Sequence, residues 1–100
     1  MQNHTKVYMN FFGHDISDTI LCEMCAAVAV DIHHIEKRNK TKNDYIENLI
    51  ALCRDCHINA ESDKSFNSYC RIQHLELVCH QVYALIDLNR KLNNYENKRY

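Results

Sequence analysis

The sequence predicts an α+β fold, in which a β-hairpin and a short helix lie between a short N-terminal helix and a long C-terminal helix. Two runs rich in β-branched and aliphatic residues, 28–35 and 48–52, indicate the two strands. Apolar residues that recur at alternating spacings of three and four indicate an amphipathic helix at about 68–94. Two C-x2-C pairs, one before the first strand and one after the second, indicate a metal ion that joins these elements.

Length and charge limit what the chain can be. A chain of 100 residues is expected to form a single domain, residues 1–100, and at this length it buries only about 60 to 65% of the surface that its unfolded form exposes. A structural metal would add stability that the small core lacks. The net charge of −1 and the isoelectric point near 6.6 exclude a global attraction to nucleic acid, so any DNA-binding surface must be local. The sequence begins without the apolar region of a signal peptide and has no apolar run long enough to span a membrane, so we expect a soluble, cytoplasmic protein without a membrane partner.

The N-terminal half is predicted to contain a short helix and the first strand. The helix, at residues 5–12, has two pairs of apolar residues at i,i+4 spacing and is followed by Gly13 as its C-cap. The strand, at residues 28–35, carries Asp31 and His33 on one face because side chains alternate along a strand. Polar groups are therefore expected to gather on that face.

The hairpin is completed by a loop and a second strand, and a short helix follows. Residues 36–47 are polar and rich in Asn, Lys and Asp, so they are expected to form an exposed loop before the strand at 48–52. The helix at about 54–62 carries His57 in its first turns. We expect His57 to point back at the hairpin.

The long helix at about 68–94 follows two plausible capping residues, Asp63 and Ser65. We expect its apolar stripe to pack against the core of the same chain, and the alternative is a homodimer seam, because the helix is long for so small a body. The stripe consists of Ile72, Leu75, Cys79, Val82 and Ile86.

The six cysteines allow three interpretations of their chemistry: zinc ligands, disulfides or a redox-active dithiol. Thiolates suit zinc, and the two C-x2-C pairs would supply the four ligands of one tetrahedral structural site. Three disulfides or a redox-active dithiol are the alternatives, and both are less favoured without a signal peptide. Cys70 and Cys79, outside the pairs, are expected to be buried as small apolar side chains. The four expected zinc ligands are Cys22, Cys25, Cys53 and Cys56.

Three segments together resemble the HNH endonuclease family, and in particular its zinc-stapled branch, whose active site is a ββα-metal finger. The resemblance covers residues 22–57 closely, and it implies an HNH core at about 20–62 with the C-terminal helix outside it. The segments are Cys22-Glu-Met-Cys25, Ala29-Val-Asp-Ile-His33-His34-Ile35 and Asn48-Leu-Ile-Ala-Leu-Cys53-Arg-Asp-Cys56-His57.

The resemblance implies a role for each motif residue. His34 corresponds to the first histidine of the motif, the general base. Asn48 corresponds to the asparagine, which fixes the loop between the strands and so orients the base. His57 corresponds to the final histidine, and with His33 it is expected to bind the catalytic divalent cation. The other histidines, His4, His14, His74 and His80, carry no motif and are expected at the surface or in packing.

The sequence departs from the family at one metal ligand. Many relatives have an aspartate where this chain has His33, and imidazole in place of a carboxylate shifts the metal preference from Mg²⁺ towards Mn²⁺, Co²⁺, Ni²⁺ or Zn²⁺. Asp31, two residues back on the same strand face, and Glu61, one helical turn after His57, are candidates for a further oxygen ligand.

Four positive charges lie within six residues of the inter-strand loop: Lys37, Arg38, Lys40 and Lys42. A solvated loop is the usual explanation for such a run, but beside the expected site we favour contact with DNA phosphates. One base and one metal can supply the activated water and the charge neutralisation that phosphodiester hydrolysis needs. The sequence therefore predicts a metal-dependent endonuclease acting on DNA, most simply double-stranded. The alternative is a noncatalytic zinc module that binds nucleic acid or protein, which would need only the cysteines.

Overall fold

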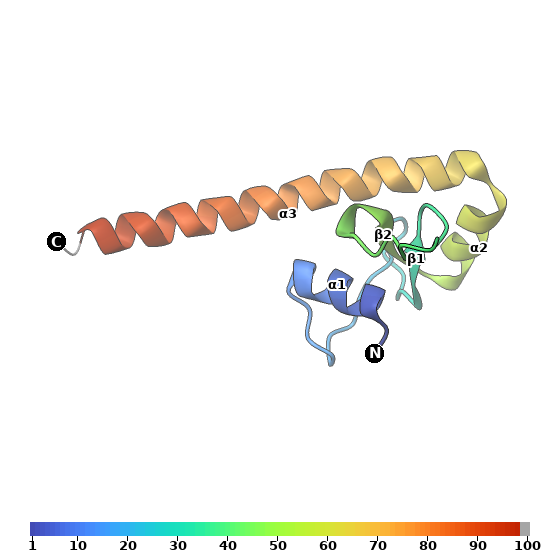
Figure 1. Cartoon of the computed structure of the whole chain (residues 1–100), viewed down its shortest axis with the longest axis horizontal. Helices are drawn as coiled ribbons and strands as arrows, with labels where there is room; N and C mark the ends of the chain where they lie inside the picture. Colours follow the sequence, from blue (N-terminus) through green and yellow to red (C-terminus); the bar gives the residue numbers. More distant parts are fainter. Residues whose placement is uncertain (99–100) are drawn as a thin grey trace.

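The computed structural model describes the backbone of residues 1–98 and the side chains of residues 1–94. The predicted α+β fold is confirmed: an antiparallel hairpin and the helix after it form a ββα unit, which one helix precedes and one long helix follows in the chain (Figure 1). In chain order the elements are α1 (Asn3–Phe12), β1 (Asp31–His34), the 3-10 helix η1 (Ile46–Asn48), β2 (Leu49–Leu52), α2 (Arg54–Ser62) and α3 (Lys64–Lys98).

The hairpin is the centre of the core because β2 is buried on both faces. Alternation directs Ile50 and Leu52 towards the cluster formed with α2 and α3, and it directs Leu49 and Ala51 towards Tyr8 of α1. All four β2 side chains are 0% exposed. The hairpin therefore lies between α1 on one face and α2 with α3 on the other.

The register of the hairpin decides where the two adjacent histidines point. β1 pairs antiparallel with β2, with His33 opposite Ile50 and His34 opposite Leu49. Cross-strand partners share a face of the sheet, so His33 lies on the α2 side and His34 on the α1 side.

Two boundaries differ from the sequence prediction for local reasons. β1 begins at Asp31 because Val28 forms an isolated bridge with Leu21, which closes the first cysteine loop instead of extending the strand. Asn48 ends η1 and precedes β2, because its side chain is committed to the loop between the strands. The C-cap was predicted correctly: Gly13 has a left-handed φ of 71°.

The prediction that the apolar stripe of the long helix packs against the core is wrong. A neighbouring row faces the body instead, formed by Cys70, His74 and Val78, with Gln81 Nε2 donating to the Phe11 carbonyl at 3.0 Å. Cys79 is exposed, whereas Cys70 is buried as expected. The exposed stripe consists of Ile72, Leu75, Cys79, Val82 and Ile86.

The body is short compared with α3. At 1.5 Å per residue the helix is about 52 Å long, and the molecule measures 58 × 31 × 28 Å, so the C-terminal part of α3 extends beyond the other elements (Figure 1). From Val82 to Asn94 every side chain is exposed. Within the described residues, no helix is long and apolar enough to cross a membrane.

Candidate functional site

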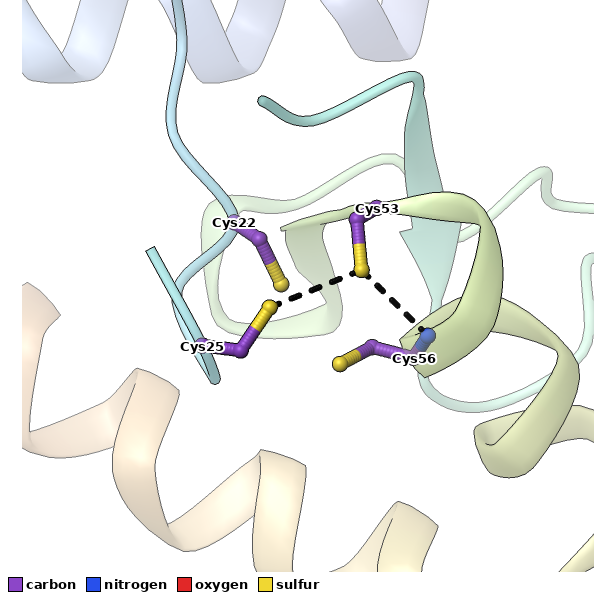
Figure 2. Close-up of side chains that lie close together, drawn as sticks. All are labelled: Cys22, Cys25, Cys53 and Cys56. Atoms are coloured by element: carbon purple, nitrogen blue, oxygen red, sulfur yellow. Dashed lines mark hydrogen bonds between the residues drawn. The ribbon is translucent and has the colours of Figure 1, made fainter. Parts of the chain in front are cut away.

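The four cysteines of the C-x2-C pairs meet at one point. Two come from the loop before β1 and two from the start of α2, and their sulfur atoms point towards one another (Figure 2). The four sulfurs lie within 4.8 Å of one another, and Cys25 Sγ lies 3.6 Å from Cys53 Sγ. Tetrahedral zinc with Zn–S bonds of 2.3 Å needs sulfurs about 3.8 Å apart. The cluster therefore has the donors and spacing of a structural zinc site.

Backbone N–H groups around the cluster favour thiolate. Burial raises the pKa of the Cys22 thiol, but the backbone N–H groups of Cys53, Met24 and Cys25 outweigh it and lower the pKa to about 7. The Cys56 thiol shows the opposite shift, because burial and the neighbouring thiols raise its pKa. Four thiolates this close together would repel one another, which disfavours ionisation of all four. A bound dication would neutralise that repulsion.

A second group of potential ligands lies between β1 and α2. It consists of His33, His57 and Glu61, whose ligand atoms lie within 4.8 Å of one another. Glu61 Oε1 is 3.0 Å from His57 Nε2 and 4.0 Å from His33 Nδ1, and the two rings are 4.9 Å apart. Glu61 reaches both rings because it lies one helical turn after His57 on α2. Two imidazoles and one carboxylate make a donor set suited to a first-row divalent cation.

Hydrogen bonds from outside this group fix the two rings. The Asn67 side chain donates from Nδ2 to the Ile35 carbonyl at 2.8 Å, so its Oδ1 is the atom that accepts from His33 Nε2 at 2.9 Å. The Nδ1 lone pair of His33 is then free on the side of Glu61. Burial also lowers the pKa of His33, which favours the neutral ring that a metal ligand requires.

His57 lies between two carboxylates. Its Nδ1 is 2.8 Å from Asp31 Oδ2, and its Nε2 faces Glu61. Such a histidine can donate to one carboxylate while its other nitrogen and the second carboxylate bind a cation. Asp31 is therefore placed to orient His57, and Glu61 is placed to be a ligand.

His34 has a separate environment on the α1 side of the hairpin. Its Nε2 lies 2.7 Å from Asp44 Oδ1, and Asn3 Nδ2 donates to the other carboxylate oxygen at 3.1 Å. The hydrogen bond from His34 lowers the pKa of the Asp44 carboxyl. An ionised Asp44 accepts the proton on Nε2, so the basic lone pair of a neutral His34 is on Nδ1. That nitrogen makes no hydrogen bond to any residue within the described part of the chain.

Asn48 holds the loop between the strands. Its Oδ1 accepts from the Glu36 backbone N–H at 2.7 Å, and its Nδ2 donates to the Glu36 and Asn43 carbonyls at 3.1 and 3.2 Å. Asn43 directly precedes Asp44, so the side chain of Asn48 sets the position of the carboxylate that holds His34. Asn48 is 2% exposed, and its three hydrogen bonds satisfy most of its capacity.

His34 and the group of His33, His57 and Glu61 border one cleft of about 610 Å³. His33, His34, His57, Glu61 and Asn67 line it. Three cations, Lys37, Arg38 and Lys64, stand at the same cleft. Lys40 and Lys42 lie on the exposed loop and do not line it.

Sequence reasoning missed several neighbours of the motif residues. Asp44 stands in a polar loop without any periodic signal, and Asn67 belongs to the first turns of α3, outside the motif. His4, expected at the surface or in packing, lies with its ring 4.8 Å from that of His34. Asp31 and Glu61, in contrast, were candidates from strand alternation and from helical spacing, and both lie beside His57.

Comparison with known families supports the motif interpretation. Residues 22–63 match the family model described as HNH endonuclease, which confirms the resemblance over that segment. The match contains both cysteine pairs and all three motif positions. No curated protein and no solved structure matches the chain significantly.

Proposed function

We propose that this chain, which carries an HNH endonuclease domain at residues 22–63, hydrolyses phosphodiester bonds of double-stranded DNA with the help of a divalent cation. The observation that carries the proposal is the opening of His34 and of the His33, His57 and Glu61 group onto one cationic cleft. A module with only a structural role would need the cysteines but not this second arrangement.

His33 Nδ1, His57 Nε2 and the Glu61 carboxylate are the proposed ligands of the catalytic cation. Asp31 and Asn67 act as positioning residues, because each fixes the ring nitrogen that faces away from the cation. When bound, the cation neutralises charge that develops on the phosphoryl and leaving-group oxygens. Two nitrogen ligands favour Mn²⁺, Ni²⁺ or Zn²⁺ over Mg²⁺.

His34 is the proposed general base. Asp44 holds the proton of the neutral ring on Nε2, which leaves Nδ1 to accept a proton from the attacking water. As the reaction proceeds the ring becomes an imidazolium, and the ionised Asp44 stabilises it. Asn48 supports this pair indirectly through the Asn43 carbonyl.

The four cysteines are proposed to bind one structural Zn²⁺. The ion would join the loop before β1 to the start of α2, and it would thereby fix β1 and α2, which carry the cleft residues. The cysteine site and the histidine site thus have separate roles, one in folding and one in hydrolysis.

DNA is proposed to bind across the cationic side of the cleft. Lys37, Arg38 and Lys64 are placed to contact phosphates near the scissile bond, and the exposed Lys40 and Lys42 extend the positive surface along the loop. Phosphate contacts carry no sequence information, so we expect little sequence specificity.

The nuclease proposal is tested with supercoiled plasmid, Mn²⁺, Ni²⁺ or Mg²⁺, and a chelator control. His34→Ala should reduce the nicking rate by about 10² to 10⁴-fold while the fold is retained, because only the base is lost. His80→Ala removes an exposed histidine from α3 and should cleave as fast as the wild type. Equal rates for His34→Ala and the wild type would reject the proposed base. A folded wild type that fails to cleave with each of the three cations would favour the noncatalytic zinc module.

We also propose that α3 pairs with a second copy of the chain. The exposed stripe follows the alternating three and four spacing of a coiled-coil seam. Such a row can pack against the same row of α3 in a second copy of the chain. Sedimentation velocity should show a dimer that Ile86→Lys, within the stripe, dissociates and that Ala84→Lys, outside the stripe, does not. A monomer at all concentrations would reject the seam and leave the nuclease proposal intact.

A further inference from the structure

His4, His34 and Asp44 form a further cluster, on the face of β1 opposite the His33 group. Their ligand atoms lie within 4.8 Å of one another. His4 comes from the first turn of α1, His34 from β1, and Asp44 from the inter-strand loop. The rings of His4 and His34 are 4.8 Å apart, and His34 Nε2 is 2.7 Å from the Asp44 carboxylate. Two imidazoles and a carboxylate thus converge at a point that the proposed reaction does not use as a metal site.

The environment of His4 is unusual for a surface histidine. Its Nδ1 is buried and has no hydrogen-bond partner within the described part of the chain. Buried polar atoms are nearly always paired, so an unpaired nitrogen in a ring that lies beside a histidine and a carboxylate needs an explanation. Burial, followed by the proximity of His34, lowers the pKa of His4 and favours its neutral form. A neutral imidazole with an unused lone pair is the form that binds metals.

A carboxylate in this cluster is already fixed for ligation. Asn3, the residue before His4, donates to Asp44 Oδ2 at 3.1 Å, which leaves Oδ1 directed at His34. The start of α1 therefore supplies both a ligand and the group that orients the carboxylate. Mg²⁺ prefers oxygen ligands in octahedral geometry, whereas this set suits a borderline-soft cation such as Zn²⁺.

We propose that His4, His34 and Asp44 form an inhibitory site for a divalent transition-metal cation of the Zn²⁺ class. The proposal rests on the proposed function, because it assigns regulation to the general base. A cation bound to Nε2 of His34 takes the position of the proton that Asp44 accepts. The neutral ring must then carry its proton on Nδ1, with no net proton release. Nδ1 can no longer accept a proton from water, so the bound cation switches the base off.

Zn²⁺ binding tests the site without any need for activity. The background is His57→Ala, in which the His33 group is weakened, in the full chain with its cysteine site loaded with zinc. Calorimetric titration with Zn²⁺ should detect a further site in this protein. Adding His4→Ala should weaken that site at least about 10-fold, whereas adding His80→Ala should leave it unchanged. Equal Zn²⁺ affinity with and without His4 would overturn the proposal, whether or not the protein cleaves DNA.

Inhibition of plasmid nicking by Zn²⁺ provides a second test. With Mn²⁺ at saturation, increasing Zn²⁺ should inhibit plasmid nicking by the wild type, and His4→Ala should need at least about 10-fold more Zn²⁺ for half inhibition. The rate of His4→Ala in Mn²⁺ alone should equal that of the wild type. Equal inhibition of both proteins would mean that Zn²⁺ acts by displacing Mn²⁺ at the His33 group, and it would overturn the inhibitory role.

Discussion

His33 and His34 are neighbours in the sequence, but their environments differ in almost every respect. His33 is 7% exposed, packs against His57 and is anchored by Asn67 of α3. His34 is paired with Asp44 and lies against α1. Strand alternation predicted this separation from the sequence, because successive side chains point to opposite faces. The partners were not predictable, since Asp44 and Asn67 approach only through the loop and α3.

The pairing of His34 with Asp44 leads to a prediction for a conservative substitution. Asp44→Asn keeps the size of the side chain but loses the charge that holds the proton on Nε2, so we expect the nicking rate to fall by about 10² to 10⁴-fold with little loss of stability. In the wild type the pKa of the Asp44 carboxyl is lowered, so the carboxylate stays ionised at pH values where an ordinary aspartate becomes protonated. The hydrogen bond from His34 to an ionised Asp44 is therefore lost only at still lower pH. Asp87→Asn, at an exposed position of α3, is the matched control. A wild-type rate for Asp44→Asn would show that the carboxylate does not position the base.

At the level of elements, the short ββα unit could be read from the sequence and the position of α3 could not. The β2 run is apolar throughout, and the burial of all its side chains follows from layers on both faces. The row of the long helix that packs contains His74 beside Cys70 and Val78, so apolar spacing alone does not select it. Polar contacts of His74 fix which row of α3 faces the body. This residue is 0% exposed, and it binds the Glu23 carboxylate at 2.8 Å and the Ile46 carbonyl at 2.6 Å.

His74 connects several elements of the fold through its two hydrogen bonds. Glu23 lies between the first two cysteines and also accepts from the hydroxyl of Tyr8 on α1 at 2.7 Å. Ile46 belongs to η1, next to Asn48. The contact therefore joins α3 to the cysteine loop, to α1 and to the loop that holds Asp44.

Removal of the His74 ring should destabilise the fold. His74→Ala leaves the buried Glu23 carboxylate with the Tyr8 hydroxyl but without its imidazole partner, so we expect the free energy of unfolding to fall by about 3 to 5 kcal/mol in chemical denaturation. His80→Ala, on the exposed side of the same helix, should change it by less than about 0.5 kcal/mol. Similar stabilities for the two variants would show that α3 is held by apolar packing alone.

At the level of the whole molecule, a small core carries the cysteine cluster and two groups of histidine and carboxylate side chains that could hold a cation. The two core clusters are modest and meet at the hairpin, and the cysteine cluster lies between the loop before β1 and α2. The four cysteine ligands were predictable because C-x2-C spacing is itself a geometric signal. The other ligand set was predictable only in part, since Glu61 was one of two acidic candidates and the geometry favours it over Asp31.

Loss of the proposed zinc should unfold the protein. A strong chelator or Cys53→Ala should remove the ion and abolish the cooperative thermal transition, because binding energy of about 10 kcal/mol or more is also folding energy in small zinc modules. Cys79→Ala, which removes an exposed cysteine outside the cluster, should retain the transition. If Cys53→Ala showed a cooperative transition with the wild-type midpoint, the cysteine cluster would not be required for folding.

The separation of the proposed zinc site from the proposed catalytic cation site can be tested by measuring zinc content and Mn²⁺-dependent nicking on the same preparation of His57→Ala. We expect about one tightly bound zinc per chain, as in the wild type, together with a loss of nicking of about 10²-fold or more. Loss of the zinc together with His57, or nicking at the wild-type rate, would contradict the proposed separation.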